Sequence, residues 1–530
     1  MGIPSYFSNI IRNYPKILEN FNNYIKNEIV FHHLFMDCNS IIYDIVNSAI
    51  IKSYDEEEFE NILIEKVIEK IINYILLIKP KKQVFIAFDG VAPFAKMKQQ
   101  KTRRYKSKFI EDFLGNKKWN TSKITPGTLF MKKLSTRVSE FFNNNDIKIK
   151  MKLKKIITST SEDPGEGEHK LFQYIRNNNF KKDNVMIYGL DSDLIMLTIF
   201  HYHLYNNCYI FREAPDFLNN ITGQKYDIND KLVIDISLLR KSILSEMNFN
   251  EEQRIYDYVF MCFLLGNDFL PHFPALNIRT HGIYTLLDIY TLVFKKNHNK
   301  FLTKQTTSGL KIEWNNFKLL IKELVKREHQ YIIEEYYNRD KYDNWNWAEN
   351  LNTISLDDRE KILQNLPIIY RKEEKYICPD ENGWEDRYYK SLLNSVSNEI
   401  KQGICINYLE GLEWVFLYYS GQCFDWRWSY NYNYPPLFKD LFKYIPNDSK
   451  INFINNKRDF YISELQLLYV LPKTQHDLLD KKTFDFVKEY ISQNDDINFV
   501  WAFCRYFWES HIDFEKIDLD SIEKKYYNFI

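Results

Sequence analysis

Residues 85–107 read FIAFDGVAPFAKMKQQKTRRYKS and join an apolar run to a basic segment. Residues 84–88 are continuously apolar, which is typical of a β-strand covered on both faces. Asp89 ends this run, and no other acid occurs between residues 90 and 110. A helix after Asp89 would present four residues on one face: Lys96, Gln100, Arg103 and Arg104. The stretch therefore predicts a carboxylate at the edge of a sheet with cations beside it.

Two other apolar runs end in the same way. Residues 31–36 lead to Asp37, and residues 185–188 lead to Asp191. Such runs alternate with helical patterns up to about residue 285, which predicts an α/β domain. Because ligands lie beyond the carboxyl ends of strands in open α/β sheets, we expect the carboxylates to converge there. Seven acids stand at such positions: Asp37, Asp89, Glu166, Glu168, Asp191, Asp193 and Asp268.

These seven acids predict a metal site. A buried carboxylate is costly unless a cation lies beside it, so a cluster of carboxylates needs several positive charges. Two Mg²⁺ ions about 3.5–4 Å apart would activate a water and stabilise the leaving oxygen in phosphodiester hydrolysis. Mn²⁺ is expected to substitute. His169 and His272 adjoin acids, but hard cations prefer oxygen, so we expect them to orient other groups or to be structural.

The basic face of residues 96–104 predicts a phosphate pocket. Arginine suits this role because its planar guanidinium pairs with two phosphate oxygens at once. A terminal 5′ phosphate held beside two metal ions would position the first phosphodiester for attack. A solvated basic helix face is the alternative, and the neighbouring acids make it the weaker one.

Three further segments give local predictions. Residues 147–154 alternate apolar residues with lysines, which predicts an edge strand protected by charge, or else a stripe that follows phosphates. Thr125 and Pro126 are expected to open a helix that runs toward Phe142. Residues 164–165 precede a second helix, which would carry three residues near its first turn: Glu166, Glu168 and His169.

The sequence predicts three parts. Residues 1–285 form the α/β domain with the acids and the phosphate pocket, residues 286–365 a polar helical connecting segment, and residues 366–530 a mainly helical region. In the last region, Trp426 and Trp428 stand in a loop rich in Pro and Tyr, where they could stack on bases. Three aromatic residues at helical spacing are instead expected in the core: Trp414, Tyr418 and Tyr419.

Composition predicts an intracellular, soluble protein, cytoplasmic in preference to nuclear. Of the 530 residues, 45% are hydrophobic and 27% charged, and the net charge is zero, so any contact with nucleic acid must come from local patches. The seven cysteines include no CxxC pair, which argues against disulfides or zinc. Residues 62–78 are interrupted by charges, which indicates an amphipathic helix and no membrane association.

The chain resembles the Xrn family of 5′-to-3′ exoribonucleases in motifs spread over most of its length. These motifs are MGIPSYF at 1, FMDCNSIIYD at 35, FIAFDGVAPFAKMKQQKTRRYKS at 85, ITPGTLFM at 124, DPGEGEHK at 163, YGLDSDLIML at 188, FMCFLLGNDFLPHFP at 260, GWEDRYYK at 383, YLEGLEWVFLYYSGQCFDWRWSYNYNYPP at 408 and WESHIDFEKIDLDSIEKK at 508.

The resemblance implies a nuclease domain like that of PIN and flap-endonuclease proteins, with a twisted, mostly parallel sheet flanked by helices. A mainly helical second region would close the active site. The implied activity is Mg²⁺-dependent, processive hydrolysis of single-stranded RNA bearing a 5′ monophosphate, with release of nucleoside 5′-monophosphates in RNA decay. The seven acids fall on the family's metal-binding positions. Four residues fall on its 5′-phosphate pocket: Lys96, Gln100, Arg103 and Arg104.

The resemblance also implies partners and leaves alternatives open. Single-stranded RNA is the expected partner, a decapping factor would supply its 5′ ends, and the chain is expected to act as a monomer. A structure-specific flap-type DNA endonuclease is less favoured, because the second region matches the RNA-degrading family. A catalytically silent RNA-binding scaffold is opposed by the intact acidic set. The bias toward Ile, Lys and Asn suits an AT-rich genome, such as that of a large DNA virus.

Two departures from the family pattern matter. Tyr43 stands where the family usually has a histidine that forms one side of a base-stacking clamp. Tyrosine can still stack, but it does not ionise near neutral pH. The other side of the clamp would come from Trp426 or Trp428, and the sequence does not decide between them. The long carboxyl-terminal extensions of larger family members are also expected to be absent.

Overall fold

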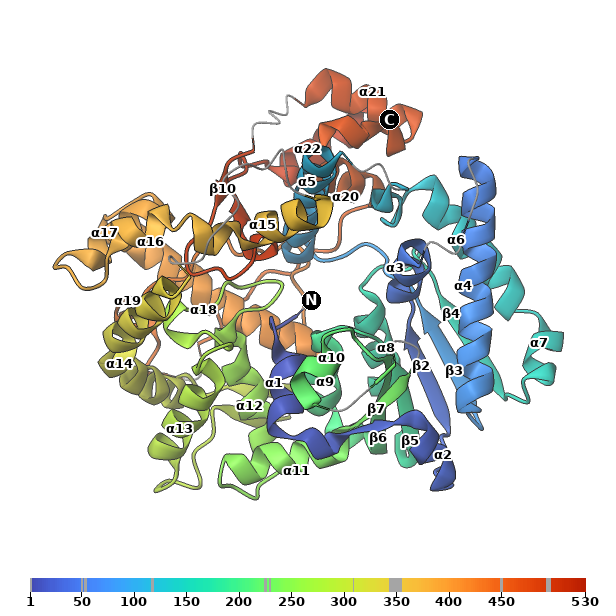
Figure 1. Ribbon diagram of the computed structural model, residues 1–530, viewed down its shortest axis with the longest axis horizontal. Coiled ribbons are helices and arrows are strands. Elements are labelled where there is room, and N and C mark those ends of the chain that lie inside the picture. The colour runs from blue at the N-terminus through green and yellow to red at the C-terminus, as the bar shows by residue number, and fades with distance from the viewer. Residues whose placement is uncertain are drawn as a thin grey trace.

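A seven-stranded sheet lies at the centre of the amino-terminal half of the protein (Figure 1). The computed structural model describes residues 2–48, 51, 55–115, 119–223, 226–227, 230–307, 309–342, 355–448, 451–491 and 497–530. The strand order is β1-β7-β6-β5-β2-β3-β4. The strands are β1 (Leu18–Asn20), β2 (His33–Asp37), β3 (Gln83–Ala87), β4 (Lys155–Ser159), β5 (Phe180–Tyr188), β6 (Tyr205–Glu213) and β7 (Lys231–Asp235). The five strands from β6 to β4 run parallel, and β7 pairs antiparallel with both β6 and β1.

Both faces of the sheet are covered, which explains the continuous apolar strands. Leu34 and Met36 of β2 pack on one side, and Phe35 packs on the other. The first side is covered by α3 (Asn39–Asn47), α4 (Glu56–Ile78) and α6 (Leu129–Phe142). The second side is covered by α1 (Tyr6–Asn13), α8 (Gly167–Arg176), α9 (Ser192–Phe200), α11 (Ile236–Glu246) and α12 (Arg254–Cys262). The predicted α/β domain is therefore confirmed.

The second region is mainly helical, as predicted. It packs on the second side of the sheet and shares its core. Its helices are α13 (Gly282–Phe294), α14 (Trp314–Asp340), α15 (Leu356–Ile369), α16 (Lys372–Ile377), α17 (Trp384–Leu393), α18 (Asn398–Ser420), α19 (Phe438–Tyr444), α20 (Ser463–Val470), α21 (Lys481–Tyr490) and α22 (Leu519–Phe529). It also has two short antiparallel pairs, β8 (Thr303–Thr306) with β9 (Gly309–Ile312), and β10 (Phe499–Val500) with β11 (His511–Ile512). Among the described residues, no helix combines the length and apolarity needed to cross a bilayer.

Helix α5 (Phe94–Leu114) stands among elements of the second region in Figure 1, next to α15 and α20. Its first turns pack on α20, where Met97 joins a separate apolar cluster with Leu465 and Leu468. Residues of β10 and of the segment after it hold its other face. Lys106 donates from Nζ to the carbonyl oxygen of Trp508 (2.8 Å), and Phe109 packs against Phe499 and Phe507. The second region therefore holds the helix predicted to carry the basic face from two sides.

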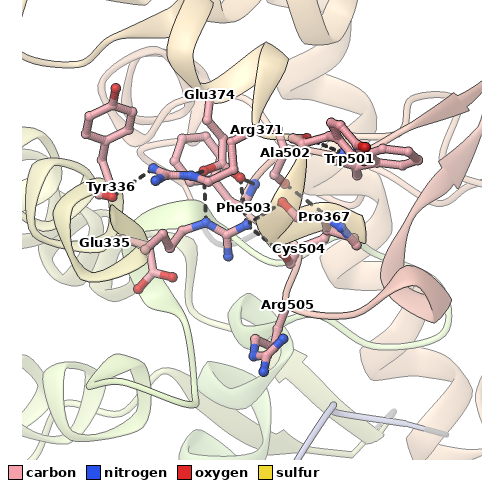
Figure 2. A network of polar contacts seen from close by, with 12 residues as sticks. Glu335, Tyr336, Pro367, Arg371, Glu374, Trp501, Ala502, Phe503, Cys504 and Arg505 are labelled. Atoms are coloured by element: carbon pink, nitrogen blue, oxygen red, sulfur yellow. Dashed lines mark hydrogen bonds and ion pairs between the residues drawn. The ribbon is translucent and has the colours of Figure 1, made fainter. Parts of the chain in front are cut away.

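A buried network of charges fixes the segment that holds α5 (Figure 2). Glu374 of α16 pairs with Arg339 of α14 (Oε1 to Nη2, 2.7 Å) and with Arg371 (Oε2 to Nε, 2.7 Å). Its Oε1 also accepts the backbone N–H of Phe503 (2.7 Å), and Arg339 donates to the carbonyl of Cys504 (2.7 Å). All three charged side chains are buried. The network therefore ties α14 and α16 to residues 503–504.

The predicted edge strand at residues 147–154 is wrong. A short helix, α7 (Asn145–Lys150), occupies most of it, and β4 begins only at Lys155. The alternating pattern contains Ile147 and Met151 at i and i+4, and both pack against the core while Ile149 is 70% exposed. Asn144 caps the helix by accepting the backbone N–H of Asp146. The same residues therefore fit a helical pattern better than a strand.

The two helix starts predicted from the sequence have different outcomes. The helix expected from Thr125 starts later, because Thr128 is the residue that caps α6, accepting the backbone N–H of Met131. The helix expected after residues 164–165 is confirmed as α8, and Glu166 occupies its N-cap position. The remaining short helices are α2 (Phe21–Lys26) and α10 (Leu218–Thr222). The predicted connecting segment, residues 286–365, contains most of α13 and all of α14, so its separate status stays a prediction.

Candidate active site

Three parallel strands deliver carboxylates to one edge of the sheet. Asp37 is the last residue of β2 and stands beside Ala87, the last residue of β3. Asp89 follows two residues later. On the other side of β2, strand β5 ends at Tyr188, and Asp191 follows three residues further on. Parallel pairing thus brings these three acids to the same edge.

Asp89 is held rigidly, whereas Asp37 has an unused oxygen. Asn39 donates from Nδ2 to Oδ2 of Asp89 (2.6 Å), and the backbone N–H of Gly167 donates to its Oδ1 (2.7 Å). Oδ1 of Asp37 is buried and has no hydrogen-bond partner in the described part of the chain. A Cβ atom on Gly167 would lie 2.4 Å from this oxygen, so only glycine allows the approach. A buried carboxylate oxygen left in this way calls for a cation.

Helix α8 adds two acids from its first turn. Glu166 is the N-cap residue, and Glu168 lies in the first turn, where the helix dipole favours negative charge. Oxygens of Asp37, Asp89 and Glu168 all lie within 4.8 Å of one another. A second group with the same spacing joins Glu166, Glu168 and His169. Both groups contain Glu168. Two neighbouring cations held by shared carboxylates would need such a residue between them.

Helix α9 and a glycine turn supply the other three acids. Asp191 is the N-cap residue of α9, and Asp193 lies in its first turn. Asp268 follows Gly266, whose φ of 84° lies in the left-handed region. The backbone N–H of Gly2 donates to Oδ1 of Asp268 (3.1 Å), and a Cβ on Gly2 would lie 2.0 Å from Oδ1 of Asp193. The amino-terminal segment therefore packs directly against these two carboxylates.

Lys96 of α5 joins the two halves of the acidic cluster. Its Nζ lies 2.7 Å from Oδ2 of Asp268 and forms an ion pair with Glu166. Burial alone would lower the pKa of Lys96, but the carboxylates of Asp268 and Glu166 raise it well above the ordinary value. The lysine is therefore a fixed positive charge inside the cluster.

The negative charge still exceeds the positive charge that the chain supplies there. Burial, followed by repulsion from Asp89, raises the pKa of Asp37 well above its usual range. Burial, followed by Glu166, does the same for Glu168. Such shifts mean that these carboxylates are costly to ionise without further cations. Together with the unused oxygen of Asp37, this oxygen-rich donor set fits hard divalent cations such as Mg²⁺ or Mn²⁺.

Two tyrosines of the second region contact the acids, which the sequence did not indicate. Tyr418 donates from its hydroxyl to Oε1 of Glu166 (2.8 Å), and Tyr419 donates to Oδ1 of Asp193 (3.0 Å). Both are buried, as expected, but their hydroxyls face the site. The ring of His169 stacks on Tyr418 with centroids 3.7 Å apart. Helix α18 thus forms a wall of the acidic cluster.

The four basic-face residues separate into different environments. Lys96 lies in the cluster, and Gln100 accepts a hydrogen bond from Gln466 (3.1 Å). Arg103 is exposed and has no hydrogen-bond or ion-pair partner among the described residues. Burial alone would raise the pKa of Asp268, but Lys96 chiefly lowers it, and Arg103 lies near enough to add to that lowering. Arg104 instead donates to the carbonyls of residues 121 and 124 (3.1 and 3.0 Å). Arg103 is therefore available to a ligand, whereas the guanidinium of Arg104 braces a loop.

The three residues expected to stack on bases differ in burial and in their distance from the acids. Tyr43 of α3 is half-buried against the core. Trp428 is only 6% exposed and stacks on Trp414 with centroids 5.2 Å apart. Trp426 lies against Gly165, just before Glu166, with an indole carbon 3.8 Å from where a Cβ would stand on that glycine. This geometry favours Trp426 over Trp428 for contact with a substrate.

Two family models match this chain. Residues 1–214 match the family model described as the XRN 5′-3′ exonuclease N-terminus. Residues 248–376 and 372–497 match the model described as the Xrn1 helical domain. The chain therefore belongs to the Xrn family.

Curated relatives of this chain are named as 5′-3′ exoribonucleases. The 5′-3′ exoribonuclease 1 of Saccharomyces cerevisiae is 27% identical over 90% of this chain and 40% of its own length. The 5′-3′ exoribonuclease 2 homolog of Drosophila melanogaster is 26% identical over 83% of this chain and 61% of its own. The 5′-3′ exoribonuclease 2 of Arabidopsis thaliana is 26% identical over 89% of this chain and 61% of its own length. The chain thus spans between 40% and 61% of the length of these relatives.

Proposed function

We propose that this protein is a processive 5′-to-3′ exoribonuclease that hydrolyses single-stranded RNA with a 5′ monophosphate to nucleoside 5′-monophosphates. The observation that carries the proposal is the convergence of the acidic cluster with Arg103. Carboxylates from separate segments gather at one edge of the sheet, and the buried Lys96 of α5 pairs with two of them, Glu166 and Asp268. Arg103, which has no hydrogen-bond or ion-pair partner among the described residues, lies on the same helix. Membership in the Xrn family supports the choice of RNA and of the 5′ end.

The residues that would hold two Mg²⁺ ions follow from the spacing of the oxygens. Asp37, Asp89 and Glu168, whose oxygens lie within 4.8 Å of one another, would hold one ion. The second ion would take its ligands from acids on the other side of Glu168: Glu166, which shares Lys96 with Asp268, and Asp191, Asp193 and Asp268, which lie close enough to shift one another's pKa. When bound, such ions lower the pKa of an attacking water and stabilise the leaving oxygen. Mn²⁺ would fit the same donors.

The remaining residues bind and orient the substrate. Lys96 and Arg103 would hold the 5′ phosphate, with Gln100 beside them, and so fix the first phosphodiester against the acids. Trp426 and Tyr43 would stack on the leading bases. The walls contributed by α18 and α5 would limit the access of bulk water to the cluster, which strengthens each charge interaction. We also propose that the protein acts as a monomer in the cytoplasm, on ends that a decapping factor has freed.

The test compares RNAs of one sequence that differ only at the 5′ end. End-labelled RNA with a 5′ monophosphate, triphosphate or hydroxyl is incubated with Mg²⁺, beside matched single-stranded and flapped DNA. We expect mononucleotide release from the monophosphorylated RNA and none from Asp89→Asn, which keeps the shape of the site but removes a charge. Internal cuts in the flapped DNA would indicate a flap endonuclease instead. Binding without any cleavage would indicate a scaffold.

A further inference from the structure

Six exposed lysines form a row along the edge of the sheet where the parallel strands begin, opposite the edge that carries the acids. The lysine row consists of Lys81, Lys152, Lys154, Lys155, Lys181 and Lys182. The backbone N–H groups of Lys154 and Lys155 both donate to the carbonyl oxygen of Lys82 (2.9 and 3.3 Å). The N–H of Lys82 donates to the carbonyl of His32 (2.8 Å), and that of His32 donates to the carbonyl of Asn184 (3.0 Å). These bonds link β4, β3, β2 and β5 at this edge.

The lysine row is long and lies apart from the acidic cluster. Neighbouring strands are about 4.8 Å apart, so a row across β5, β2, β3 and β4 is about 14 Å long. Strand β2 runs from His33 at this edge to Asp37 at the other, a rise of about 13 Å. Figure 1 shows α7, which directly precedes Lys152, at the outer margin of the molecule, whereas the amino terminus, which contacts Asp268, lies near its centre. The row is therefore separate from the phosphate pocket proposed on α5.

The positive charge of this row is not neutralised by the chain. None of the six lysine side chains has a hydrogen-bond or ion-pair partner among the residues that the structure describes. Asp183, an acid at this edge, is buried and already pairs with Lys82 (2.6 Å) and His33 (2.8 Å). Three segments that form the edge contain no acid, residues 71–88, 147–161 and 169–182, although the whole chain has 71 acidic and 71 basic residues. Positive charge is thus concentrated here on a protein of zero net charge.

A row of this kind suits the phosphate backbone of a duplex. A nucleic-acid duplex carries about one negative charge per 1.7 Å of its axis, so about 14 Å of it presents several phosphates. Single strands are usually held by stacking on aromatic rings. Here Phe31 and Phe180 are buried, and Tyr174 is half-buried beneath Lys155, whose Nζ lies 5.5 Å from the ring centroid. An anionic membrane is less favoured, because α7 exposes one apolar side chain, Ile149, and lacks the continuous apolar face that membrane-binding helices insert.

We propose that the lysine row binds the phosphate backbone of double-stranded RNA without reading its sequence. The proposal rests on the proposed function, which makes RNA the nucleic acid that the protein meets. Double-stranded RNA is recognised largely by its shape and its phosphates, which matches a surface of lysines without free aromatic rings. The row would hold a folded part of a transcript at one edge of the sheet, while a free 5′ end lies at the acids on the other.

The test measures binding of a blunt RNA duplex with 5′ hydroxyl ends, which offers no single-stranded end to the acids. Fluorescence anisotropy in EDTA gives the affinity at salt concentrations between about 50 and 200 mM. The row variant combines four substitutions: Lys154→Gln, Lys155→Gln, Lys181→Gln and Lys182→Gln. Each phosphate contact contributes about 0.9 to the slope of log affinity against log salt, so the slope should fall by about two to four. Affinity at the lowest salt should fall about tenfold or more.

The matched control removes the same charge from other helices and loops. It combines Lys241→Gln, Lys295→Gln, Lys296→Gln and Lys322→Gln, all at exposed lysines. The control should keep nearly the slope and affinity of the wild type. Equal slopes in the two fourfold variants would overturn the proposal, because the binding would then reflect net charge alone. Tighter row-dependent binding to phosphatidylserine vesicles or to polyglutamate than to the duplex at the same salt would also overturn it.

A parallel measurement separates this proposal from the proposed function. Release of mononucleotides from a short single-stranded RNA with a 5′ monophosphate is followed in Mg²⁺, and it should be the same in the wild type and the row variant. If mononucleotides are released but duplex binding does not depend on the row, only the duplex surface fails. If the duplex binds through the row but no mononucleotide is released, the exonuclease proposal fails and the surface stands.

Discussion

Tyr418 donates its hydroxyl hydrogen to Oε1 of Glu166 across 2.8 Å, although the two residues lie 252 positions apart in the sequence. Glu166 belongs to the sheet domain, and Tyr418 belongs to the second region. The next residue, Tyr419, repeats the relationship with Asp193 at 3.0 Å. The second region therefore helps to orient carboxylates that repel one another, and it does more than cover the site.

Removal of either hydroxyl should impair hydrolysis without unfolding the protein. Tyr418→Phe and Tyr419→Phe leave the packing intact but free a carboxylate oxygen to move. Loss of such an orienting partner typically costs about 10- to 100-fold in metal affinity or activity. Mg²⁺ titrations of the hydrolysis rate would separate the two effects. Tyr389→Phe is the control, because Tyr389 donates to Asp440 (2.9 Å) in a buried pair made by other elements. Equal losses in all three variants would contradict the prediction.

The two adjacent arginines of α5 should respond differently to mutation. Arg103→Ala should reduce the preference for a 5′ monophosphate over a 5′ hydroxyl about tenfold or more, because a charged hydrogen bond contributes about 1.5–3 kcal/mol. Arg104→Ala should keep the preference and lower the melting temperature, because its bonds go to carbonyls of residues 121 and 124. Competition between the two RNAs, together with thermal unfolding, would measure both. A larger loss of preference in Arg104→Ala would reverse the assignment.

Strand ends and helix faces could be predicted from the sequence because they depend on local pattern. Asp37, Asp89 and Asp191 follow apolar runs, and parallel strands bring their ends to one edge. Periodicity was less decisive at residues 147–154, where the same apolar spacing fits a strand and a helix. Contacts between side chains that are distant in the sequence showed no pattern in the sequence. Lys96 pairs with Asp268, which lies 172 residues away. This contact depends on tertiary packing, which the local spacing of residues does not encode.

Substitution of the two tryptophans in the loop at residues 425–428 should have different effects, one on RNA binding and the other on stability. Trp426→Ala should weaken binding of single-stranded RNA by about 1–3 kcal/mol for each lost base stack. Trp428 is buried on Trp414, so Trp428→Ala should lower the free energy of unfolding by about 3–5 kcal/mol. Fluorescence anisotropy with labelled RNA in EDTA and chemical denaturation would measure the two quantities. Normal RNA affinity in Trp426→Ala would assign the stacking role elsewhere.

The buried charges of Figure 2 should be essential to stability. Glu374→Gln would leave Arg339 and Arg371 without a full countercharge, and the loss of one partner from a buried pair costs about 3–5 kcal/mol. Because this network fixes residues 503–504, which precede the contacts to α5, limited proteolysis should reach that segment sooner. Glu373→Gln is the control, since Glu373 is half-buried and contacts Ser391. Equal stability of the two variants would argue against the network.

Metal binding should stabilise the protein more at high pH than at low pH. Burial, followed by the charge of Asp268, raises the pKa of Asp193 to about 7. The folded state without metal therefore keeps a proton that the unfolded chain loses near its ordinary pKa of about 4. Stability must then fall as pH rises between these two values, because the folded state binds more protons there. Mg²⁺ needs the ionised carboxylate, so its contribution grows over the same window.

Thermal unfolding with excess Mg²⁺ and with EDTA, at about pH 6 and about pH 8, would measure this linkage. The difference in melting temperature between Mg²⁺ and EDTA should be larger at the higher pH. Glu328, whose pKa burial raises to about 8, accepts backbone N–H groups of Phe438 and Lys439, so its titration shifts both measurements alike and cancels. Asp193→Asn should reduce the pH dependence of the difference, and the part that remains is expected from Asp37 and Glu168, whose pKa values burial also raises. A wild-type difference that is constant across the window would mean that Asp193 does not take part in metal binding.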